Sequence, residues 1–310
     1  MCGWWLSQIS VAFSLRLNEA DCGDDVRRLD IGICAFRDAE KLARAVAAIK
    51  QHSVTDWRLI ICDNSPADSP TRPLIEGLAA EDSRIVPRFM PENVGYAGAV
   101  NEILRWGQTP YIGYLDQDAY VQTPGWDENL CGYLDRFHEL GIVFPGWGPK
   151  SIQRPGYREI QWGVGFCWIL SRMMMDAVGV FDDKIGHQNE CDYCMRVRMG
   201  GWKCACAPEV NVLHDATATN NPASQARIDN GVRDFVTKWN RYFNGANYNY
   251  HSPMVTRWDD WPPNALYNEE YFLQKLPGLN DNPEVVMVDG AKMDLIKVLR
   301  PHDFYKGRSI

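Results

Sequence analysis

Two hydrophobic periodicities alternate along residues 29–115. Short apolar runs, typical of buried strands, are separated by stretches in which apolar residues recur every three or four positions, as on one face of a helix. The strand-like runs are 29–36, 57–62, 85–90 and 111–115, and the helix-like stretches between them are 39–51, 73–81 and 95–106. This alternation predicts an α/β fold, a Rossmann-like and mostly parallel sheet flanked by helices.

The pattern is less regular after residue 115. Residues 163–171, 203–207 and 210–214 are strand-like, and 190–199 has helical spacing. From about residue 217 the composition shifts toward Asn, Pro, Tyr and Trp. We therefore predict an N-terminal extension (1–28), a central domain (29–216) and a C-terminal appendage (217–310) that shapes an acceptor site or an oligomer contact.

Composition narrows the class of protein. The 310 residues carry a formal net charge of −8, which counts against non-specific binding to nucleic acid because phosphate contacts need Lys and Arg. Ten cysteines in a chain of this length do not indicate the disulfide framework of a small secreted protein, so reduced thiols and a cytoplasmic location are expected. No apolar run reaches about 18 residues, so no membrane span is expected.

Polar residues follow the predicted strands where each strand ends. They are Arg37, Asp63, Asn93 and Asp116. In a parallel α/β sheet, ligands bind beyond the carboxyl ends of the strands. These side chains are therefore expected to converge on one site at that edge.

An Asp-x-Asp pair follows the fourth strand-like run. Asp116 and Asp118 are two positions apart, which places both carboxylates on one side of an extended chain. Carboxylate oxygens suit Mn²⁺ or Mg²⁺, and such ions are commonly shared with phosphate oxygens. A solvated turn is the alternative interpretation of an isolated pair of this kind.

A series of short motifs surrounds this pair in a fixed order. It comprises the opening strand and helix (31–49), Ile60 to Ser65, Glu92 to Asn101, Asp116-Gln117-Asp118, Gly165-Phe166-Cys167, Asn189 to Arg196, Gly200-Gly201-Trp202, and Pro208 to Val212 with His214. Over residues 29–216 the chain thus resembles the family 2 glycosyltransferases, which have the GT-A fold.

The resemblance implies inverting transfer of a sugar from a nucleoside-diphosphate sugar to an acceptor hydroxyl, with Mn²⁺ or Mg²⁺. Glu190 and Asp192 are the implied catalytic residues, Glu190 as base and Asp192 as a supporting or helix-capping carboxylate. Family members often carry Glu-Asp-x-Asp where this chain has Asn189-Glu190-Cys191-Asp192. The implied metal ligands are Asp116, Asp118 and His214, and the implied nucleotide-sugar contacts are Phe36, Arg37, Asp63, Asn93, Gly95, Asn101, Asp116 and Gln117.

Several alternatives stay open on the sequence. Glu190 could be a helix-start carboxylate favoured by the helix dipole, and His214 a structural histidine. Cys191, Cys194, Cys204 and Cys206 have spacings compatible with zinc, although free cysteines are commonly buried. The rival functions are a nucleotidyl or phosphoryl transferase, a non-catalytic nucleotide-sugar-binding protein, and sugar transfer to a modified DNA base. The sugar, nucleobase, acceptor and oligomeric state are not predicted.

Overall fold

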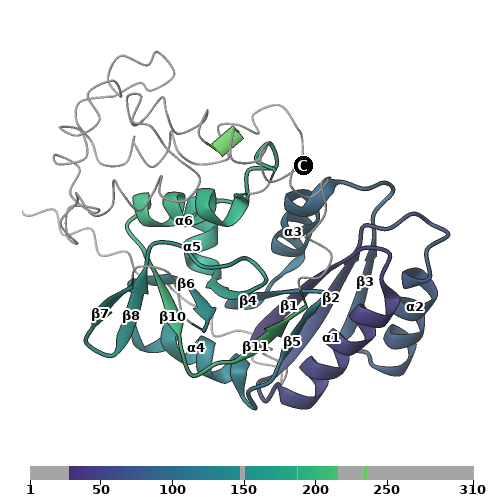
Figure 1. Cartoon of the computed structure of the whole chain (residues 1–310), viewed down its shortest axis with the longest axis horizontal. Helices are drawn as coiled ribbons and strands as arrows, with labels where there is room; N and C mark the ends of the chain where they lie inside the picture. Colours follow the sequence, from purple (N-terminus) through teal and green to yellow (C-terminus); the bar gives the residue numbers. More distant parts are fainter. Residues whose placement is uncertain (1–27, 147–150, 187, 216–233, 236–310) are drawn as a thin grey trace, which may run out of the picture.

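The computed structural model describes residues 28–146, 151–186, 188–215 and 234–235 (Figure 1). The predicted extension 1–28, except Arg28, and the predicted appendage 217–310, except 234–235, lie outside these ranges. Along the chain the elements are β1 (Leu29–Ala35), α1 (Ala39–His52), β2 (Trp57–Asp63), α2 (Thr71–Glu81), β3 (Ile85–Phe89), α3 (Gly95–Trp106), β4 (Tyr111–Asp116), β5 (Ala119–Val121), α4 (Trp126–Arg136), β6 (Leu140–Pro145), β7 (Ile152–Arg154), β8 (Tyr157–Ile160), β9 (Cys167–Ser171), α5 (Arg172–Val178), α6 (Asn189–Met199), β10 (Lys203–Ala207) and β11 (Val212–His214).

A nine-stranded mixed sheet forms the centre of the fold, in the order β3-β2-β1-β4-β9-β6-β10-β8-β7. The first four strands run parallel, as the alternating pattern predicts. β9 is antiparallel to both β4 and β6, whereas β10 is parallel to β6. The carboxyl ends of β1, β2 and β4 therefore meet at one edge, which is where the predicted site residues lie.

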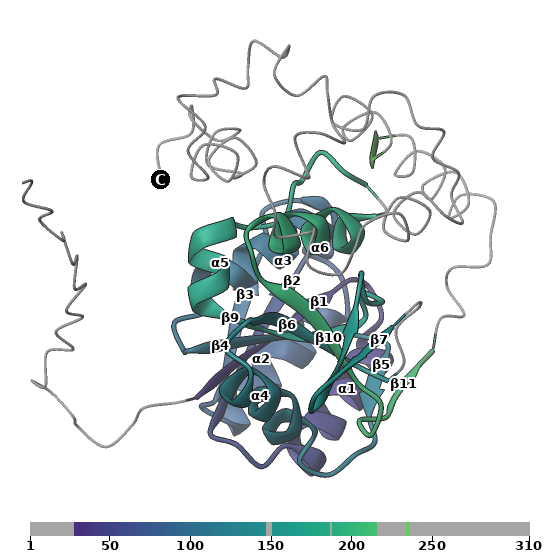
Figure 2. The ribbon, with the colours of Figure 1, turned by 90° about the vertical axis from the view of Figure 1, so that its left-hand side faces the viewer.

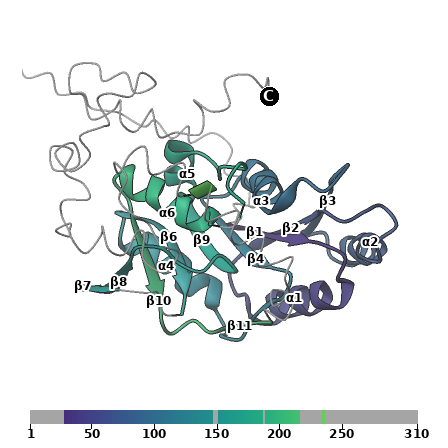
Figure 3. The ribbon, with the colours of Figure 1, turned by 45° about the horizontal axis from the view of Figure 1, so that its top comes forward.

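Helices cover both faces of the sheet, which explains why its central strands are apolar throughout. Leu59 and Ile61 of β2 pack in a core with α1, α2 and α4, while Ile60 and Cys62 point into a second core with α3, α5 and α6. Figures 1 and 3 show α3, α5 and α6 together on one face. No helix in the described part of the chain has both the length and the apolar character of a membrane span.

A second, two-stranded sheet carries the late part of the site. β11 pairs antiparallel with β5, with His214 opposite Ala119. Figures 1 and 2 place this ribbon beside α1. Because β5 directly follows the Asp-x-Asp turn, the pairing returns the chain, nearly a hundred residues later, to Asp118. The amide of Asp215 donates to the Asp118 carbonyl at 2.9 Å.

Three sequence-based boundaries need correction. Only Cys167–Ser171 of the strand-like stretch 163–171 and Val212–His214 of the stretch 210–214 are strands, and the helix expected at 73–81 begins at Thr71. Residues 163–166 form a loop, with Val164 half exposed and Gly165 near the site. Pro73 is tolerated because it lies in the first turn of α2, where its missing N–H has no intrahelical acceptor.

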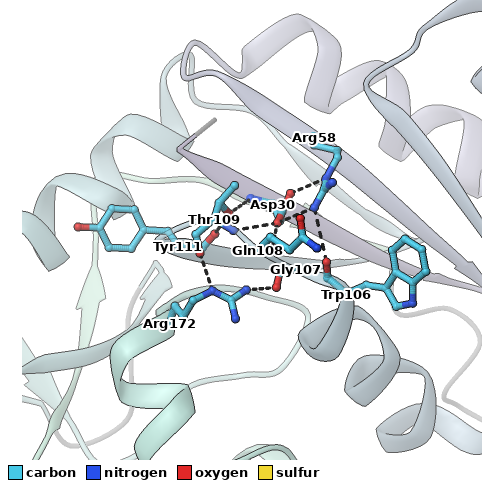
Figure 4. Close-up of polar contacts among 8 residues, drawn as sticks. All are labelled: Asp30, Arg58, Trp106, Gly107, Gln108, Thr109, Tyr111 and Arg172. Carbon is cyan, nitrogen blue, oxygen red and sulfur yellow. Dashed lines mark hydrogen bonds and ion pairs between the residues drawn. The ribbon is translucent and has the colours of Figure 1, made fainter. Parts of the chain in front are cut away.

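A buried polar network closes the opposite edge of the sheet (Figure 4). The fully buried Asp30 carboxylate accepts from Arg58 Nε at 2.7 Å and Nη2 at 2.9 Å, and from the amides of Gln108 and Thr109 at 2.5 and 3.1 Å. Arg172 then donates to the carbonyls of Thr109 and Gly107. This network joins the amino ends of β1 and β2 to the loop before β4 and to α5.

Candidate functional site

The Asp-x-Asp pair lies at the carboxyl end of β4, where the chain turns into β5. Asp116 ends β4, and its amide donates to the Phe166 carbonyl at 2.8 Å. His214 Nε2 lies 3.4 Å from Asp118 Oδ1 and 3.8 Å from Asp116 Oδ2. One ligand atom from each of the three residues falls within 4.8 Å of the others, so the three predicted metal ligands are brought together.

The electrostatics of this cluster are those of crowded acidic groups. Burial raises the pKa of Asp116 to about 7; the Tyr114 hydroxyl, which donates to Asp116 at 2.6 Å, opposes this shift, and the charge of Asp118 adds to it. The pKa of His214 is also raised, first by its hydrogen bond to Asp118. The imidazole stacks on Phe166 with ring centres 4.6 Å apart, which fixes its orientation.

A lysine lies beside the acidic cluster. Lys41 of α1 places its Nζ 3.7 Å from Asp118 Oδ2 and 3.5 Å from Asp215 Oδ2. It also donates to the Asp215 carbonyl at 3.2 Å. Burial lowers the pKa of Lys41, but the charges of Asp118 and Asp215 outweigh this and raise it, so the lysine stays charged and offsets part of the negative charge.

Glu190 approaches the cluster from α6. It lies in the first turn of this helix and is partly exposed. Its carboxylate lies against Gly165, the neighbour of Phe166, whose carbonyl accepts from the Asp116 amide. Burial raises the pKa values of Tyr96 and Asp116, and the charge of Glu190 adds to both shifts. The implied base therefore lies near the implied metal ligands.

The predicted contacts at the end of β1 form a loop held by Gln117. The Gln117 side chain accepts from the Phe36 amide at 2.8 Å and donates to the Phe36 carbonyl at 3.0 Å. Arg37 follows with a φ of 61°, the left-handed region, and its amide donates to Ser65 Oγ at 2.8 Å. Gln117 thus attaches the Asp-x-Asp turn to the β1–α1 loop, while the Phe36 and Arg37 side chains stay exposed.

The predicted contacts after β2 and β3 form a second hydrogen-bonded corner. Asp63 is buried and accepts from the Ser65 amide at 3.1 Å and from Thr71 Oγ1. Asn64 donates to Asn93 Oδ1 at 2.9 Å and to the Gly95 carbonyl at 3.1 Å. Asn93 and Gly95 are exposed at the same edge of the sheet as Asp116.

Two residues named from the sequence do not face this site. Asn101 is buried, and its amide group both donates to and accepts from the Phe181 backbone, at 2.9 and 2.8 Å. These bonds confirm the expectation that Asn101 bonds backbone, and its contact with the nucleotide stays a prediction. Asp192 is fully buried and pairs with Arg196 at 3.0 Å, a contact that fits the expected supporting role of this carboxylate.

Five further residues complete the site, and no role was predicted for them. Lys41 and Asp215 flank the acidic cluster, Tyr114 bonds Asp116, Asn64 bonds Asn93 at the corner, and Tyr96 lies beside Glu190. The sequence contains a signal for two of these residues. Tyr114 is two positions before Asp116 on the same strand face, and Asp215 directly follows His214.

The cysteines are free thiols throughout the described ranges. Seven of these eight cysteines are buried, and Cys34 is partly exposed. Within those ranges the one group of side chains arranged to hold a metal ion is Asp116, Asp118 and His214. In the described part of the chain, Cys191, Cys194, Cys204 and Cys206 are not brought together as a group of this kind.

Solved structures identify the class of this fold. The chain superposes on the mannosyltransferase PcManGT from Pyrobaculum calidifontis in complex with GDP-Man and Mn²⁺, with a TM-score of 0.59 and 13% identity over 92% of this chain and 89% of that one. It also superposes on GalNAc-T7 with UDP, GalNAc and Mn²⁺, with a TM-score of 0.59 and 12% identity over 90% of this chain and 55% of that one. The match to TarS 1–349 of S. aureus has a TM-score of 0.52 and 9% identity over 91% and 92% of the two chains. The shared architecture is the GT-A fold.

The family follows from the sequence comparison. Residues 30–181 match the model described as Glycosyl transferase family 2, so this part of the chain is a glycosyltransferase domain of family 2. The chain is 24% identical over 135 residues to the teichoic acid poly(glycerol phosphate) polymerase of Staphylococcus epidermidis. It is 29% identical over 130 residues to the chondroitin synthase of Escherichia coli. These alignments cover 44% and 41% of this chain, and the chain spans only 18% of the length of either relative.

Proposed function

We propose that this chain is a metal-dependent, inverting glycosyltransferase that moves a sugar from a nucleoside-diphosphate sugar to an acceptor hydroxyl. The observation that carries the proposal is the convergence of Asp116, Asp118 and His214 within 4.8 Å. The partly exposed carboxylate of Glu190 lies close enough to influence Asp116. The family 2 match and the GT-A fold support the same class of reaction.

The donor set fits Mn²⁺ or Mg²⁺. Two carboxylates and one imidazole are ligands that Mn²⁺ accepts readily, and the carboxylates suit Mg²⁺ as well. Burial raises the pKa of Asp116, and the charges of Asp118 and Glu190 add to the shift, so a cation bound there would offset that negative charge. Such an ion, when bound, supplies charge stabilisation for the leaving diphosphate.

We assign the proton transfer to Glu190. Its carboxylate accepts the proton of the acceptor hydroxyl as the acceptor oxygen bonds to the anomeric carbon from the face opposite the leaving group. The bond between that carbon and the diphosphate oxygen breaks, and the nucleoside diphosphate departs with the electron pair. A single carboxylate suffices for an inverting reaction of this kind, and general-base catalysis contributes about 10²–10⁴-fold.

We assign donor binding to the loops beyond β1, β2 and β3. Phe36 and Arg37 are exposed there, Asn93 and Gly95 lie at the adjacent corner, and Asp63 fixes that corner through Ser65 and Thr71. The backbone amides of these loops and the start of α3 are suited to contacts with anionic and ribose oxygens. We also propose that the enzyme acts in the cytoplasm, where its free cysteines stay reduced.

The test is release of nucleoside diphosphate from UDP-, GDP- and dTDP-sugars in the presence of Mn²⁺, with CMP release from a CMP-sugar as a further arm. We expect one donor to be consumed, Asp118→Asn to abolish the reaction, and Glu190→Gln to lower the rate by about 10²-fold or more while the donor still binds. Asp82→Asn is the matched carboxylate control, because Asp82 pairs with Lys50 and Arg84 at the end of α2.

The other outcomes contradict the proposal in different ways. Release of pyrophosphate would indicate nucleotidyl transfer. Binding of a donor that no acceptor consumes, including saccharides and glycosylatable modified DNA, would indicate a binding protein. Full activity of Glu190→Gln would remove Glu190 as base, and full activity of Asp118→Asn would remove the metal assignment.

A further inference from the structure

Three elements that are far apart in the sequence meet around the Glu190 carboxylate. Tyr96 comes from the first turn of α3, Gly165 from the loop before β9, and Glu190 from the first turn of α6. The Tyr96 hydroxyl donates to the Gly165 carbonyl oxygen at 3.5 Å, and the Glu190 carboxylate fills the space next to Gly165. Burial raises the pKa of Tyr96, and the charge of Glu190 adds to this shift, so the carboxylate lies beside the Tyr96 hydroxyl and the bare backbone of Gly165.

Gly165 provides the space that Glu190 occupies. A Cβ added to Gly165 would lie 2.0 Å from Glu190 Oε1 and 2.3 Å from its carboxyl carbon. Gly165 is not among the glycines with a positive φ, so its backbone would accept alanine. Because the clash is with the end of a flexible side chain, alanine would displace the Glu190 carboxylate rather than the loop.

Tyr96 is itself held rigidly. Its ring packs edge-on against Tyr114, with centres 5.7 Å apart and planes at 87°. Tyr114 in turn donates its hydroxyl to Asp116 at 2.6 Å. Two neighbouring tyrosines thus lie beside the carboxylates of the site: Tyr114 donates to Asp116, and Tyr96 lies next to Glu190.

An aromatic column connects these tyrosines to the helix that carries Glu190. Tyr114 stacks on Trp168 at 5.2 Å, Trp168 on Phe181 at 5.8 Å, and Phe181 on Tyr193 of α6 at 4.4 Å. Tyr193 is three residues after Glu190, almost one helical turn. The column sets the position of α6 relative to β4, so the distance between the Glu190 and Asp116 carboxylates is fixed by buried packing.

We propose that Tyr96 and Gly165 are positioning residues for Glu190: the Tyr96 hydroxyl orients the carboxylate toward the acceptor, and the absent side chain at 165 leaves it room. This inference rests on the proposed function of Glu190 as base. It assigns to the second residue of α3 a role in proton transfer, separate from the donor contacts at Asn93 and Gly95. A misplacement of about 1 Å at a catalytic group can cost about 10²-fold in rate.

The experiment measures kcat and KM for Tyr96→Phe and Gly165→Ala, each alone and combined with Glu190→Gln. Each single variant is expected to lower kcat by about tenfold to a hundredfold while the donor KM changes by less than about threefold. Combined with Glu190→Gln, neither is expected to lower kcat further, because residues that act through one group are not additive. Tyr96→Phe keeps the ring in the aromatic column, so its fold is preserved.

Matched controls separate positioning from general effects of the substitutions. Tyr133→Phe removes a hydroxyl that donates to Glu209 at 2.9 Å, and Gly132→Ala adds a methyl group with no atom within 4 Å, both on α4. Both controls should keep normal kcat.

The inference is overturned if Tyr96→Phe and Gly165→Ala match these controls while Glu190→Gln is inactive, or if their losses are equally large in the Glu190→Gln background. If Glu190→Gln is fully active, the base assignment fails, and the positioning role fails with it. Either of the first two results overturns the positioning role but leaves Glu190 as the proposed base. Failure of this inference can therefore be told apart from failure of the proposed function.

Discussion

Two buried or partly buried aspartates at opposite ends of the parallel strands are bonded in very different ways. Asp30, at the amino end of β1, accepts four hydrogen bonds from Arg58 and from two backbone amides (Figure 4). Asp116, at the carboxyl end of β4, receives one hydroxyl from Tyr114 and faces the carboxylate of Asp118. The first group is fully satisfied by the protein, and the second is not.

The difference separates residues that hold the fold together from residues that do chemistry. A buried carboxylate stabilises a fold only when donors surround it, as they surround Asp30. A carboxylate left with few donors and a like-charged neighbour keeps its capacity for a cation or a substrate proton, at some cost in stability. The amino-end network therefore serves the sheet, and the carboxyl-end cluster serves the proposed reaction.

The comparison is tested most strongly by removing one aspartate from each edge. Asp30→Ala leaves Arg58 and two amides without their acceptor, so we expect a loss of about 3–5 kcal/mol in the free energy of unfolding. Asp118→Ala removes one of two adjacent negative charges and should change that free energy by less than about 1 kcal/mol while abolishing sugar transfer. Urea unfolding of both variants, with activity measured in parallel, checks this; a larger loss for Asp118→Ala would reverse the assignment of the two edges.

The pKa values of Asp116 and His214 provide a second test of the carboxyl-end cluster. Asp116 has a raised pKa of about 7, and His214 also has a raised pKa, so both hold protons at pH 6 that a cation must displace. Mn²⁺ affinity should therefore tighten by at least about tenfold between pH 6 and pH 8. Calorimetric titration with Mn²⁺ at several pH values measures this, and Asp116→Asn should flatten the dependence. An affinity that stays constant over this range in the unmodified chain would contradict the assignment.

The raised pKa of Asp116 also makes the stability of the metal-free protein depend on pH. The folded state binds the Asp116 proton more tightly than the unfolded chain does. The stability contributed by this group is thus present at acidic pH and is lost as the pH rises through about 7.

Replacing Lys41 is expected to have the smallest effect of these substitutions. Its ammonium lies 3.7 Å from Asp118 and opposes cation binding there. Lys41→Met should therefore tighten binding of Mn²⁺ alone by about threefold to tenfold, and the gain should shrink in high salt. Lys50→Met is the control, because Lys50 pairs with Asp82. An unchanged or weaker Mn²⁺ affinity for Lys41→Met would show that the lysine does not compete with the cation.

The sequence predicts the first half of the fold well because strands and helices there have distinct periods. Strand β1 and helix α1 appear at almost the predicted residues, and α3 at exactly those residues. The pattern does not predict α4, β6 or the β7–β8 hairpin. Helix α4 buries a polar Asp127 among its apolar residues, and in β7 two of three residues are exposed, so neither shows a simple period.

The sequence predicts only those site residues whose motif assigns them a role. Asp116, Asp118 and His214 converge because β11 returns to pair with β5, a long-range contact that no local pattern contains. Asn101 and Asp192 look like site residues within their motifs, yet the structure turns them toward Phe181 and Arg196. Tyr96 and Gly165 lie beside Glu190, which belongs to a third segment, so no local pattern contains their proposed roles.

Binding of nucleoside diphosphates to the intact chain tests the central claim most directly. Thermal unfolding is measured with UDP, GDP and dTDP, and with CMP as a further arm, each with and without Mn²⁺, for the unmodified chain and for Asp118→Ala. Ligand at about a hundred times its Kd adds about 2.7 kcal/mol, a shift of several degrees. We expect such a shift for one nucleotide, dependent on both Mn²⁺ and Asp118. Unfolding temperatures that no nucleotide raises, or that rise equally without Asp118, would contradict it.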